Sequence, residues 1–219
     1  MYTVFANRND AAKRLAAALD SYRGKNPLVL AIPRGAVPMG QVIADELDGE
    51  FDVVLVRKLR SPYSPEFAIG AVDETGWIYI APHAREAGAT TEYIEREQQE
   101  QLAIMNRRRA LYTPGRPPLD PRGRIAIVVD DGLATGATMI AALHAVRTKA
   151  PARLVCAVPV ASPRSREMIR AYSDEVVCLE TPQDFYAVGQ FYTSFPQVED
   201  EEVVALLRTR RRKREVQHG

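Results

Sequence analysis

The chain has 219 residues, of which 46% are hydrophobic and 26% charged, and its formal net charge is +1. This composition is typical of a soluble globular protein with one large domain or at most two small ones, and it excludes a strong overall attraction to nucleic acid or membranes. No run of about 18 apolar residues is present, and the opening "MYTVFANRNDAAKRL" lacks the pattern of a secretory signal. We therefore expect a cytoplasmic protein, with Cys156 and Cys178 as buried free thiols.

Helical and strand patterns alternate from the beginning of the chain. Apolar residues recur at helical spacing over residues 10–19, which predicts an amphipathic helix. A strand at 27–33, a helix at 37–47 and a strand at 51–59 follow. Residues 60–80 combine prolines, glycines and alternating aromatic positions, and they predict a mobile loop leading into a hairpin rather than a core element.

The next segments are a long helix and three strands. Residues 90–112 predict a polar helix, and its arginines at 107–109 fit a solvated helix end better than a nucleic-acid patch. Apolar runs predict strands at 124–130, 152–160 and 175–179, with helical segments after the first two.

Strands that are apolar almost throughout and alternate with helices predict a doubly wound, mainly parallel α/β sheet flanked by helices. In such sheets ligands bind beyond the carboxyl ends of the strands, where the strand order reverses. We therefore expect a site at the loops after Ile32 and Val129. We place the domain at 1–207 and expect 208–219, with its run of arginines and lysine, to be a basic, disordered tail.

Two carboxylates and a Gly-rich turn follow the strand at 124–130, in the stretch "VVDDGLATGATM". Small residues and two hydroxyls at a helix N-terminus form a phosphate cradle, because backbone N–H groups converge there and the helix dipole is positive. Carboxylates beside a phosphate would repel it unless they bind ribose hydroxyls or a divalent cation. The inferred ligand is a sugar phosphate, and a plain turn with a helix cap is the alternative.

The same stretch resembles the 5-phosphoribosyl-1-pyrophosphate (PRPP) motif of the type I phosphoribosyltransferases, which has an apolar strand, two acidic residues, two variable residues and T-G-x-T. The resemblance implies the fold of that family, with a flexible hairpin and a small hood. It also implies that Asp130 and Asp131 bind the ribose hydroxyls, act in catalysis and hold Mg²⁺, largely through ligand or water. The residues implied to bind ribose 5-phosphate are Asp130, Asp131, Gly132, Leu133, Ala134, Thr135, Gly136, Ala137 and Thr138.

A second stretch, "IPRGAVPMG", is similar to the pyrophosphate loop of the family. Glycine tolerates close approach of a ligand, and arginine supplies fork-like donors to phosphate oxygens. The resemblance implies that Arg34, Gly35 and Ala36 bind the diphosphate. Alone, the stretch would favour an ordinary strand-to-helix turn, and it is the first motif that favours the pyrophosphate loop.

A third stretch, "VRKLRSPYSPEFAIGAV", resembles the corresponding region of adenine and orotate phosphoribosyltransferases. The resemblance implies that Arg57 or Lys58 approaches the diphosphate while residues 60–76 close over it and exclude water. Glu66 or Glu74 on this segment is a candidate for handling a base proton. A surface hairpin with basic flanks is the alternative.

The resemblance indicates the acceptor of the phosphoribosyl group only by exclusion. Members that use 6-oxopurines carry an aspartate immediately before the Thr-Gly, and this chain has Ala134 there, so a 6-oxopurine acceptor is not expected. Phe185 and Tyr186 are candidates for stacking on a flat base, although core packing would explain them equally well.

The resemblance implies transfer of the phosphoribosyl group of PRPP to a nitrogenous base, with Mg²⁺ as cofactor and pyrophosphate as product. Expected partners are small molecules, with a second copy of the chain as a further candidate, but neither a membrane nor, in this first hypothesis, a nucleic acid. One alternative is a non-catalytic regulator that binds PRPP or a nucleotide, and that binds RNA through its basic residues. Another is hydrolysis of a phosphorylated sugar.

Overall fold

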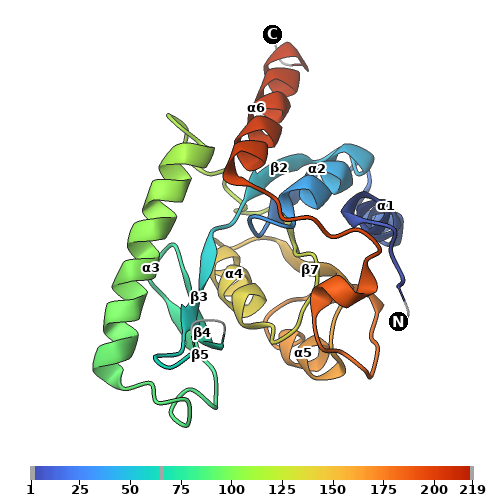
Figure 1. The fold of residues 1–219 in the computed structure, drawn as a ribbon. Coiled ribbons are helices and arrows are strands. Elements are labelled where there is room, and N and C mark those ends of the chain that lie inside the picture. The colour runs from blue at the N-terminus through green and yellow to red at the C-terminus, as the bar shows by residue number, and fades with distance from the viewer. Residues whose placement is uncertain (1–2, 65–66, 218–219) are drawn as a thin grey trace.

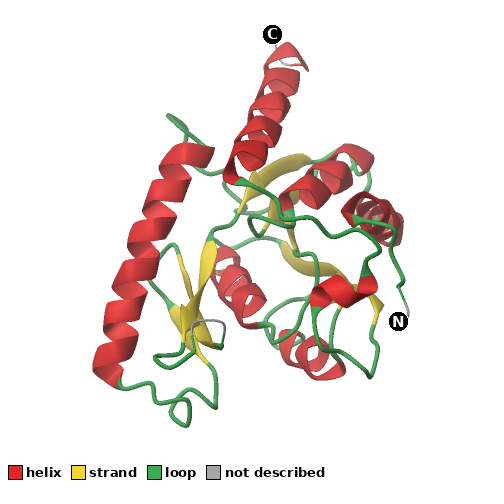
Figure 2. Ribbon diagram, viewed as in Figure 1, coloured by secondary structure: helices red, strands yellow, loops and turns green. Residues whose placement is uncertain are grey.

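The computed structural model describes residues 3–64 and 67–217, and for 209–217 it describes the backbone only. The helices are α1 (Arg8–Ala18), α2 (Val37–Glu46), α3 (Thr91–Tyr112), α4 (Ala137–Arg147), α5 (Pro163–Ile169) and α6 (Asp200–Gln217), with 3-10 turns at Asp20–Tyr22 and Val188–Phe191. The strands are β1 (Leu28–Ala31), β2 (Glu50–Val53), β3 (Val56–Arg60), β4 (Ala68–Asp73), β5 (Ile78–Ile80), β6 (Ile125–Val129), β7 (Arg153–Val160) and β8 (Glu175–Glu180). Figure 1 shows their arrangement, and Figure 2 shows that helices surround the strands.

The larger sheet has five parallel strands in the order β2-β1-β6-β7-β8. Along the chain, the connection from β1 leads outward to β2, whereas β6 returns to the other side of β1. The strand order therefore reverses between β1 and β6, which is where ligands bind in doubly wound sheets. The predicted doubly wound, mainly parallel α/β sheet is confirmed.

Alternate residues of the parallel strands face the two sides of the sheet, as the pleat requires. Val29 and Ala31 of β1 pack in one buried cluster with residues of α1 and α2. Leu28 and Leu30 pack in a second buried cluster with residues of α4. Because both faces are covered, the strands are apolar on both sides, which explains their nearly continuous hydrophobic runs. Cys156 is a buried free thiol in β7, as expected, whereas the expectation of burial is wrong for Cys178, a free thiol in β8 that is partly exposed.

A second, antiparallel sheet has the order β3-β4-β5. The single strand expected at 51–59 is therefore wrong, because its first part is β2 in the parallel sheet and its second part is β3 in this smaller sheet. The hairpin expected within 60–80 is present as β4 and β5. However, the expectation that it lies outside the core is wrong, since Ile69, Ala71 and Val72 are fully buried.

Strand β4, in the middle of the smaller sheet, is buried because helices pack on both faces of this sheet. Leu59 and Ile69 pack in the same cluster as Met105 of α3, whereas Val56 and Ala71 pack in the cluster that contains α4. Figure 1 shows α3 running along this sheet on the side away from α4. Helix α4 therefore lies between the two sheets and holds them together.

Thr90 is the N-cap residue of the long helix α3, and its side chain accepts a hydrogen bond from the backbone N–H of Tyr93. The solvated end expected at 107–109 is wrong for Arg109. This guanidinium donates to both oxygens of Glu74 and to the carbonyl of Val53, and it is mostly buried. Arg109 thus anchors the segment that connects β2 to β3. This contact explains how α3, which has few apolar residues, packs against the rest of the protein.

Helix α6 extends away from the body at the top of Figure 1 and runs to Gln217. Its backbone is helical over most of the segment expected to be a disordered tail, and its first turn carries Asp200, Glu201 and Glu202, which favour a helix N-terminus. The division of the chain after residue 207 stays a prediction. Within the described residues, no helix is both long and apolar enough to span a bilayer.

Candidate functional site

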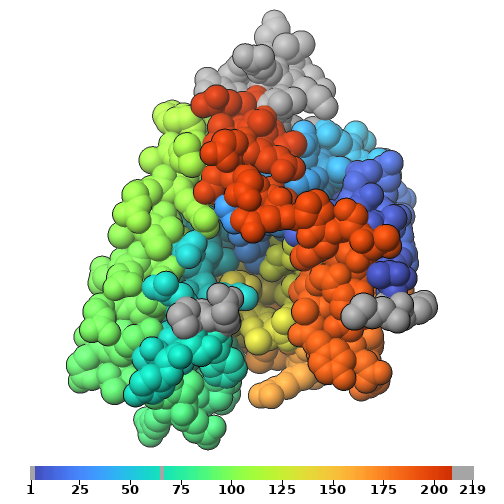
Figure 3. Space-filling model, viewed as in Figure 1, coloured from blue at the N-terminus to red at the C-terminus, as the bar shows by residue number. Residues whose placement is uncertain are grey.

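A pocket of about 260 Å³ opens where the strand order of the parallel sheet reverses. Figure 3 shows the surface hollowed where α4, the β3 segment and the segment around Val188 come together. The pocket is lined by the loops after β1 and β6, with Lys58 from β3 and Val188 from residues 181–191 after β8, which we call the hood. Its lining residues are Ile32, Pro33, Gly35, Lys58, Asp130, Asp131, Gly132, Leu133, Ala134, Thr135, Gly136, Thr138 and Val188.

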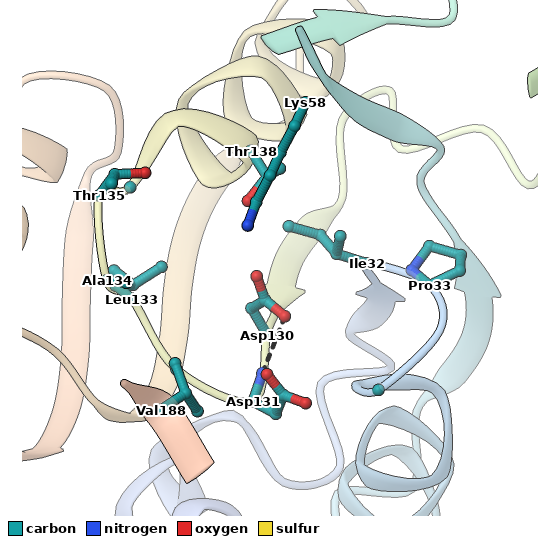
Figure 4. Close-up of a pocket in the computed structure, with 13 residues that line it drawn as sticks. Ile32, Pro33, Lys58, Asp130, Asp131, Leu133, Ala134, Thr135, Thr138 and Val188 are labelled. Carbon is teal, nitrogen blue, oxygen red and sulfur yellow. Dashed lines mark hydrogen bonds between the residues drawn. The ribbon is translucent and has the colours of Figure 1, made fainter. Parts of the chain in front are cut away.

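Asp130 and Asp131 lie at the floor of this pocket, directly after β6 (Figure 4). The backbone N–H of Asp131 donates to Asp130 Oδ1 at 2.9 Å, which orients the first carboxylate. Burial and the neighbouring Asp131 carboxylate raise the pKa of Asp130 well above its ordinary value. Burial also raises the pKa of Asp131, against the opposing effect of the Arg8 guanidinium. Two partly buried carboxylates side by side favour binding of hydroxyl donors or a cation.

The loop that follows leads into the N-terminus of α4, and five of its residues line the pocket. Gly136 is the N-cap residue of α4 and has a φ of 78°, the left-handed region that glycine adopts without steric cost. The first backbone N–H groups of a helix have no intrahelical acceptor, and no side chain caps this terminus, so these groups suit an anion. Ala137 is the first residue of α4 and faces the core instead of the pocket.

Two serines of the α5 segment hold this loop from behind. Ser165 Oγ donates to the carbonyl of Ala134 at 2.6 Å, and Ser162 Oγ donates to the same oxygen at 3.2 Å. Ser165 is itself buried. The Ala134 carbonyl is therefore held by α5 and its N-cap serine.

The loop after β1 approaches the carboxylates through its glycine. A Cβ atom added to Gly35 would overlap with Asp131 Oδ2 and would lie 3.1 Å from Arg8 Nη2. Arg34 does not line the pocket, because its guanidinium pairs with Glu199 at 3.1 Å and lies 3.9 Å from Asp200. Ala36 is fully buried as the N-cap residue of α2.

Strand β3 delivers one of its two neighbouring basic residues to the pocket. Figure 4 shows the amino group of Lys58 pointing into the same space as the Asp130 carboxylate. Arg57 points to the other side of the strand, where its Nε donates to Gln101 of α3 at 2.5 Å. Glu74 accepts from Arg109 and from the backbone N–H of Leu55, which makes it a structural residue. Glu66 lies outside the described residues.

The hood places one of the two predicted aromatic residues in solvent and the other in packing. Tyr186 is 87% exposed, whereas the ring of Phe185 lies 5.1 Å from that of Phe191 and packs against the core. Neither lines the pocket, and Val188 does. Gln190 organises this turn by accepting from the backbone N–H groups of Tyr186 and Ala187.

Sequence reasoning missed Arg8, Tyr192 and the serine pair. Arg8 donates from Nε and Nη2 to Asp131 Oδ2, at 3.1 and 2.9 Å. The hydroxyl of Tyr192 donates to the Asp131 carbonyl at 2.7 Å, and burial together with the Asp131 carboxylate raises the pKa of Tyr192. No local pattern distinguishes either residue. Ser162 did have a signal, since a serine before Pro163 is typical of a helix N-cap.

A model of the family described as "Phosphoribosyl transferase domain" matches residues 3–195. The chain belongs to this family. A Mycobacterium tuberculosis protein named "Putative phosphoribosyl transferase" is 40% identical over 208 residues, which are 93% of this chain and 46% of that protein. The chain thus spans about half the length of the curated relatives it matches. The crystal structure of TT1426 from Thermus thermophilus is 45% identical, with a TM-score of 0.78 over 94% of this chain and 98% of that one.

The site of this phosphoribosyl transferase domain fits a magnesium ion shared with a substrate. Among the described residues, no group of three or more His, Cys, Asp or Glu side chains is arranged to hold a metal. Two carboxylates, Asp130 and Asp131, face the pocket. Magnesium is commonly bound by one or two carboxylates together with substrate oxygens and water, and not by a cage of protein ligands. These residues therefore suit an ion that arrives with a phosphorylated ligand.

The resemblance implies that this pocket binds PRPP, and on that expectation replacing Gly35 by alanine should weaken PRPP binding by about tenfold or more, because the new methyl group would push the loop after β1 away from Asp131. Isothermal titration calorimetry would measure the change. Gly24→Ala is the matched control, because a Cβ atom at Gly24 meets nothing within 4 Å. The backbone of Gly24 has a φ of 72°, and an alanine in this conformation should lower the free energy of unfolding by only about 1–2 kcal/mol. Equal PRPP affinities in the two variants would contradict the close approach that we describe.

Proposed function

We propose that this protein transfers the 5-phosphoribosyl group of PRPP to a nitrogenous base in the cytoplasm and releases pyrophosphate. The observation that carries the proposal is the pocket itself. It combines two carboxylates, an uncapped helix N-terminus and a lysine at the switch point of a phosphoribosyl transferase fold. Each of these groups suits a different part of PRPP, and together they account for the sugar, the 5-phosphate and the diphosphate.

The roles of the residues follow from the charges that develop in the reaction. As the bond at ribose C1 breaks, positive charge grows on the sugar ring and negative charge grows on the diphosphate. Asp130 and Asp131 would hold the ribose hydroxyls, and backbone N–H groups of residues 135–138 would hold the 5-phosphate. Lys58 and the backbone at Gly35 would receive the leaving diphosphate. Mg²⁺, when bound, would neutralise charge on the diphosphate.

Catalysis would then depend mainly on positioning. Of the residues that the resemblance implies for the diphosphate, Arg34 would have to exchange its pairing with Glu199 for phosphate oxygens. Arg57 would have to leave Gln101. Lys58 requires no such exchange, because its amino group already faces the pocket.

The acceptor is proposed to be a base other than a 6-oxopurine. Ala134 lines the pocket at the position where type I phosphoribosyltransferases that use 6-oxopurines carry an aspartate. The methyl group of alanine can neither donate nor accept a proton. The hood turn near Val188 is the proposed location of the base, with the exposed ring of Tyr186 available for stacking.

Calorimetry of the purified protein with PRPP and Mg²⁺ tests the proposal. We expect saturable binding that depends on Mg²⁺, followed by pyrophosphate release when the correct free base is added from a panel. Absence of PRPP binding would refute the proposal. Binding without pyrophosphate release for any base would favour the non-catalytic regulator, and phosphate release without a base would favour sugar-phosphate hydrolysis.

A further inference from the structure

Arg8 occupies an unusual position at the back of the pocket. Its guanidinium approaches Asp131 Oδ2 with two donors, Nε at 3.1 Å and Nη2 at 2.9 Å. Its third nitrogen, Nη1, donates to the carbonyl of Pro196 at 2.5 Å. The guanidinium also lies 3.7 Å from the ring centroid of Phe195. All three nitrogens are therefore engaged, and only 11% of the side chain is exposed.

These contacts join segments that are far apart in the sequence. Arg8 is the first residue of α1, Asp131 follows β6, and Phe195 and Pro196 lie in the segment between the hood and α6. Gly35, in the loop after β1, leaves the space that Arg8 Nη2 and Asp131 Oδ2 occupy. Arg8 is thus the point at which the N-terminal helix and the C-terminal segment meet the pocket.

Arg8 engages only one oxygen of Asp131. Among the described residues, no hydrogen bond to Asp131 Oδ1 is formed, and the Asp131 side chain is 17% exposed and lines the pocket. Two charge-assisted bonds to Oδ2 fix the plane of the carboxylate, because they remove its freedom to rotate. The other oxygen then remains for a ligand in one orientation.

We propose that Arg8 is a positioning residue that aims Asp131 at the sugar of the ligand. This inference rests on the proposed function, since it concerns the same pocket. Arg8 acts through Asp131 and not as a phosphate ligand, because it does not line the pocket and its donors are already used. Its loss should therefore affect ligands that contain the sugar and spare ligands that consist only of phosphate.

The test is a double-mutant cycle on Arg8 and Asp131 with two probes, ribose 5-phosphate and inorganic phosphate. Arg8→Gln should weaken ribose 5-phosphate about tenfold, a coupling within the range for side chains in one hydrogen-bonded network. The same substitution should change the affinity for inorganic phosphate less than about twofold. In an Asp131→Asn background, Arg8→Gln should have no further effect on ribose 5-phosphate.

Arg14→Gln is the matched control on the same helix. Arg14 also donates to a backbone carbonyl, that of Val4, lies over the ring of Phe5 and pairs with a carboxylate, Glu180, but it does not contact the pocket. This variant should bind ribose 5-phosphate as the wild type does. Unfolding measurements on both variants separate a loss of fold from a loss of positioning.

Three results would overturn the inference: unchanged ribose 5-phosphate binding in Arg8→Gln, equal weakening of both probes, or a loss that persists in the Asp131→Asn background. If Arg8→Gln does not fold, Arg8→Lys decides, because lysine keeps the charge but cannot reproduce the two-donor contact. Full affinity in Arg8→Lys would also overturn it. Failure of the wild type to bind ribose 5-phosphate and PRPP would instead refute the proposed function.

Discussion

Replacing Asp130 and Asp131 together by asparagine should abolish phosphoribosyl transfer and weaken PRPP binding by at least ~100-fold. Each carboxylate is expected to accept a charge-assisted hydrogen bond from the ribose, and such bonds contribute about 1.5–3 kcal/mol each. Asparagine has nearly the same shape, so the pocket should persist. Calorimetry with PRPP and Mg²⁺ measures the loss, and circular dichroism checks the fold. Turnover retained in the double variant would remove the carboxylates from the mechanism.

The single variant Asp130→Asn should make the protein more stable at neutral pH. Burial and Asp131 raise the pKa of Asp130, so the folded state binds the proton more tightly than the unfolded state does. This carboxyl therefore lowers the free energy of unfolding as pH rises above its unfolded pKa of about 3.9. The stability gain in Asp130→Asn should be absent near pH 3 and should grow as the pH is raised. Thermal unfolding at several pH values measures it, and an equal gain at all pH values would contradict the cause.

Asp130→Asn should thus raise the free energy of unfolding and weaken ligand binding, and this combination is expected when a residue serves binding instead of folding. A carboxylate that served the fold would stabilise it, as Asp174 does through two bonds with Arg147 and one with the backbone N–H of Leu154. Asp130 accepts a hydrogen bond only from the neighbouring Asp131 N–H among the described residues. The destabilising effect of the Asp130 carboxylate on the folded state is explained if this carboxylate binds a ligand.

The parallel sheet and the pocket loops could be predicted because their signals are local. Continuous apolar runs indicate strands that are buried on both faces. The ordered pattern around Asp130 indicates the loop that follows β6. The boundary at residues 54–55 could not be predicted in this way. An apolar run states that a segment is buried, but it does not state which of two sheets receives it, and here the chain passes from one to the other.

The roles of the arginines were the least predictable part. Arg34 stands next to a pocket glycine, yet Glu199 holds its guanidinium, whereas Arg8 is distant in sequence and contacts a pocket carboxylate. A long side chain can reach in several directions, and its choice depends on carboxylates brought close by the fold. The backbone positions of the site were therefore predictable from sequence, and the direction of its long side chains was not.

Asp52→Ala should lower the free energy of unfolding by about 3–5 kcal/mol, because it removes a fully buried carboxylate and leaves its mostly buried partner Arg116 and the backbone N–H groups bound to it without their acceptor. The Asp52 side chain is 0% exposed. Its oxygens accept from both terminal nitrogens of Arg116, at 2.8 and 2.9 Å, and from the backbone N–H groups of Val53 and Leu119, each at 2.9 Å. Asp52 thereby ties the connection between α3 and β6 to the edge strand β2.

Asp174→Ala is the matched control, because the arginine contacts are of the same kind and the main difference is burial, with one further backbone N–H, that of Val53, bound by Asp52. Asp174 also accepts from both terminal nitrogens of an arginine and from one backbone N–H, but its side chain is 40% exposed. Exposed pairs of this kind contribute about 0–1 kcal/mol. Urea unfolding should therefore give clearly different losses in the free energy of unfolding for the two variants. Similar losses would show that the hydrogen bonds, and not the burial of the charge, determine the stability. Because Asp52 lies away from the pocket loops, folded Asp52→Ala should still bind PRPP, which separates the part of the chain that maintains the fold from the part that binds the ligand.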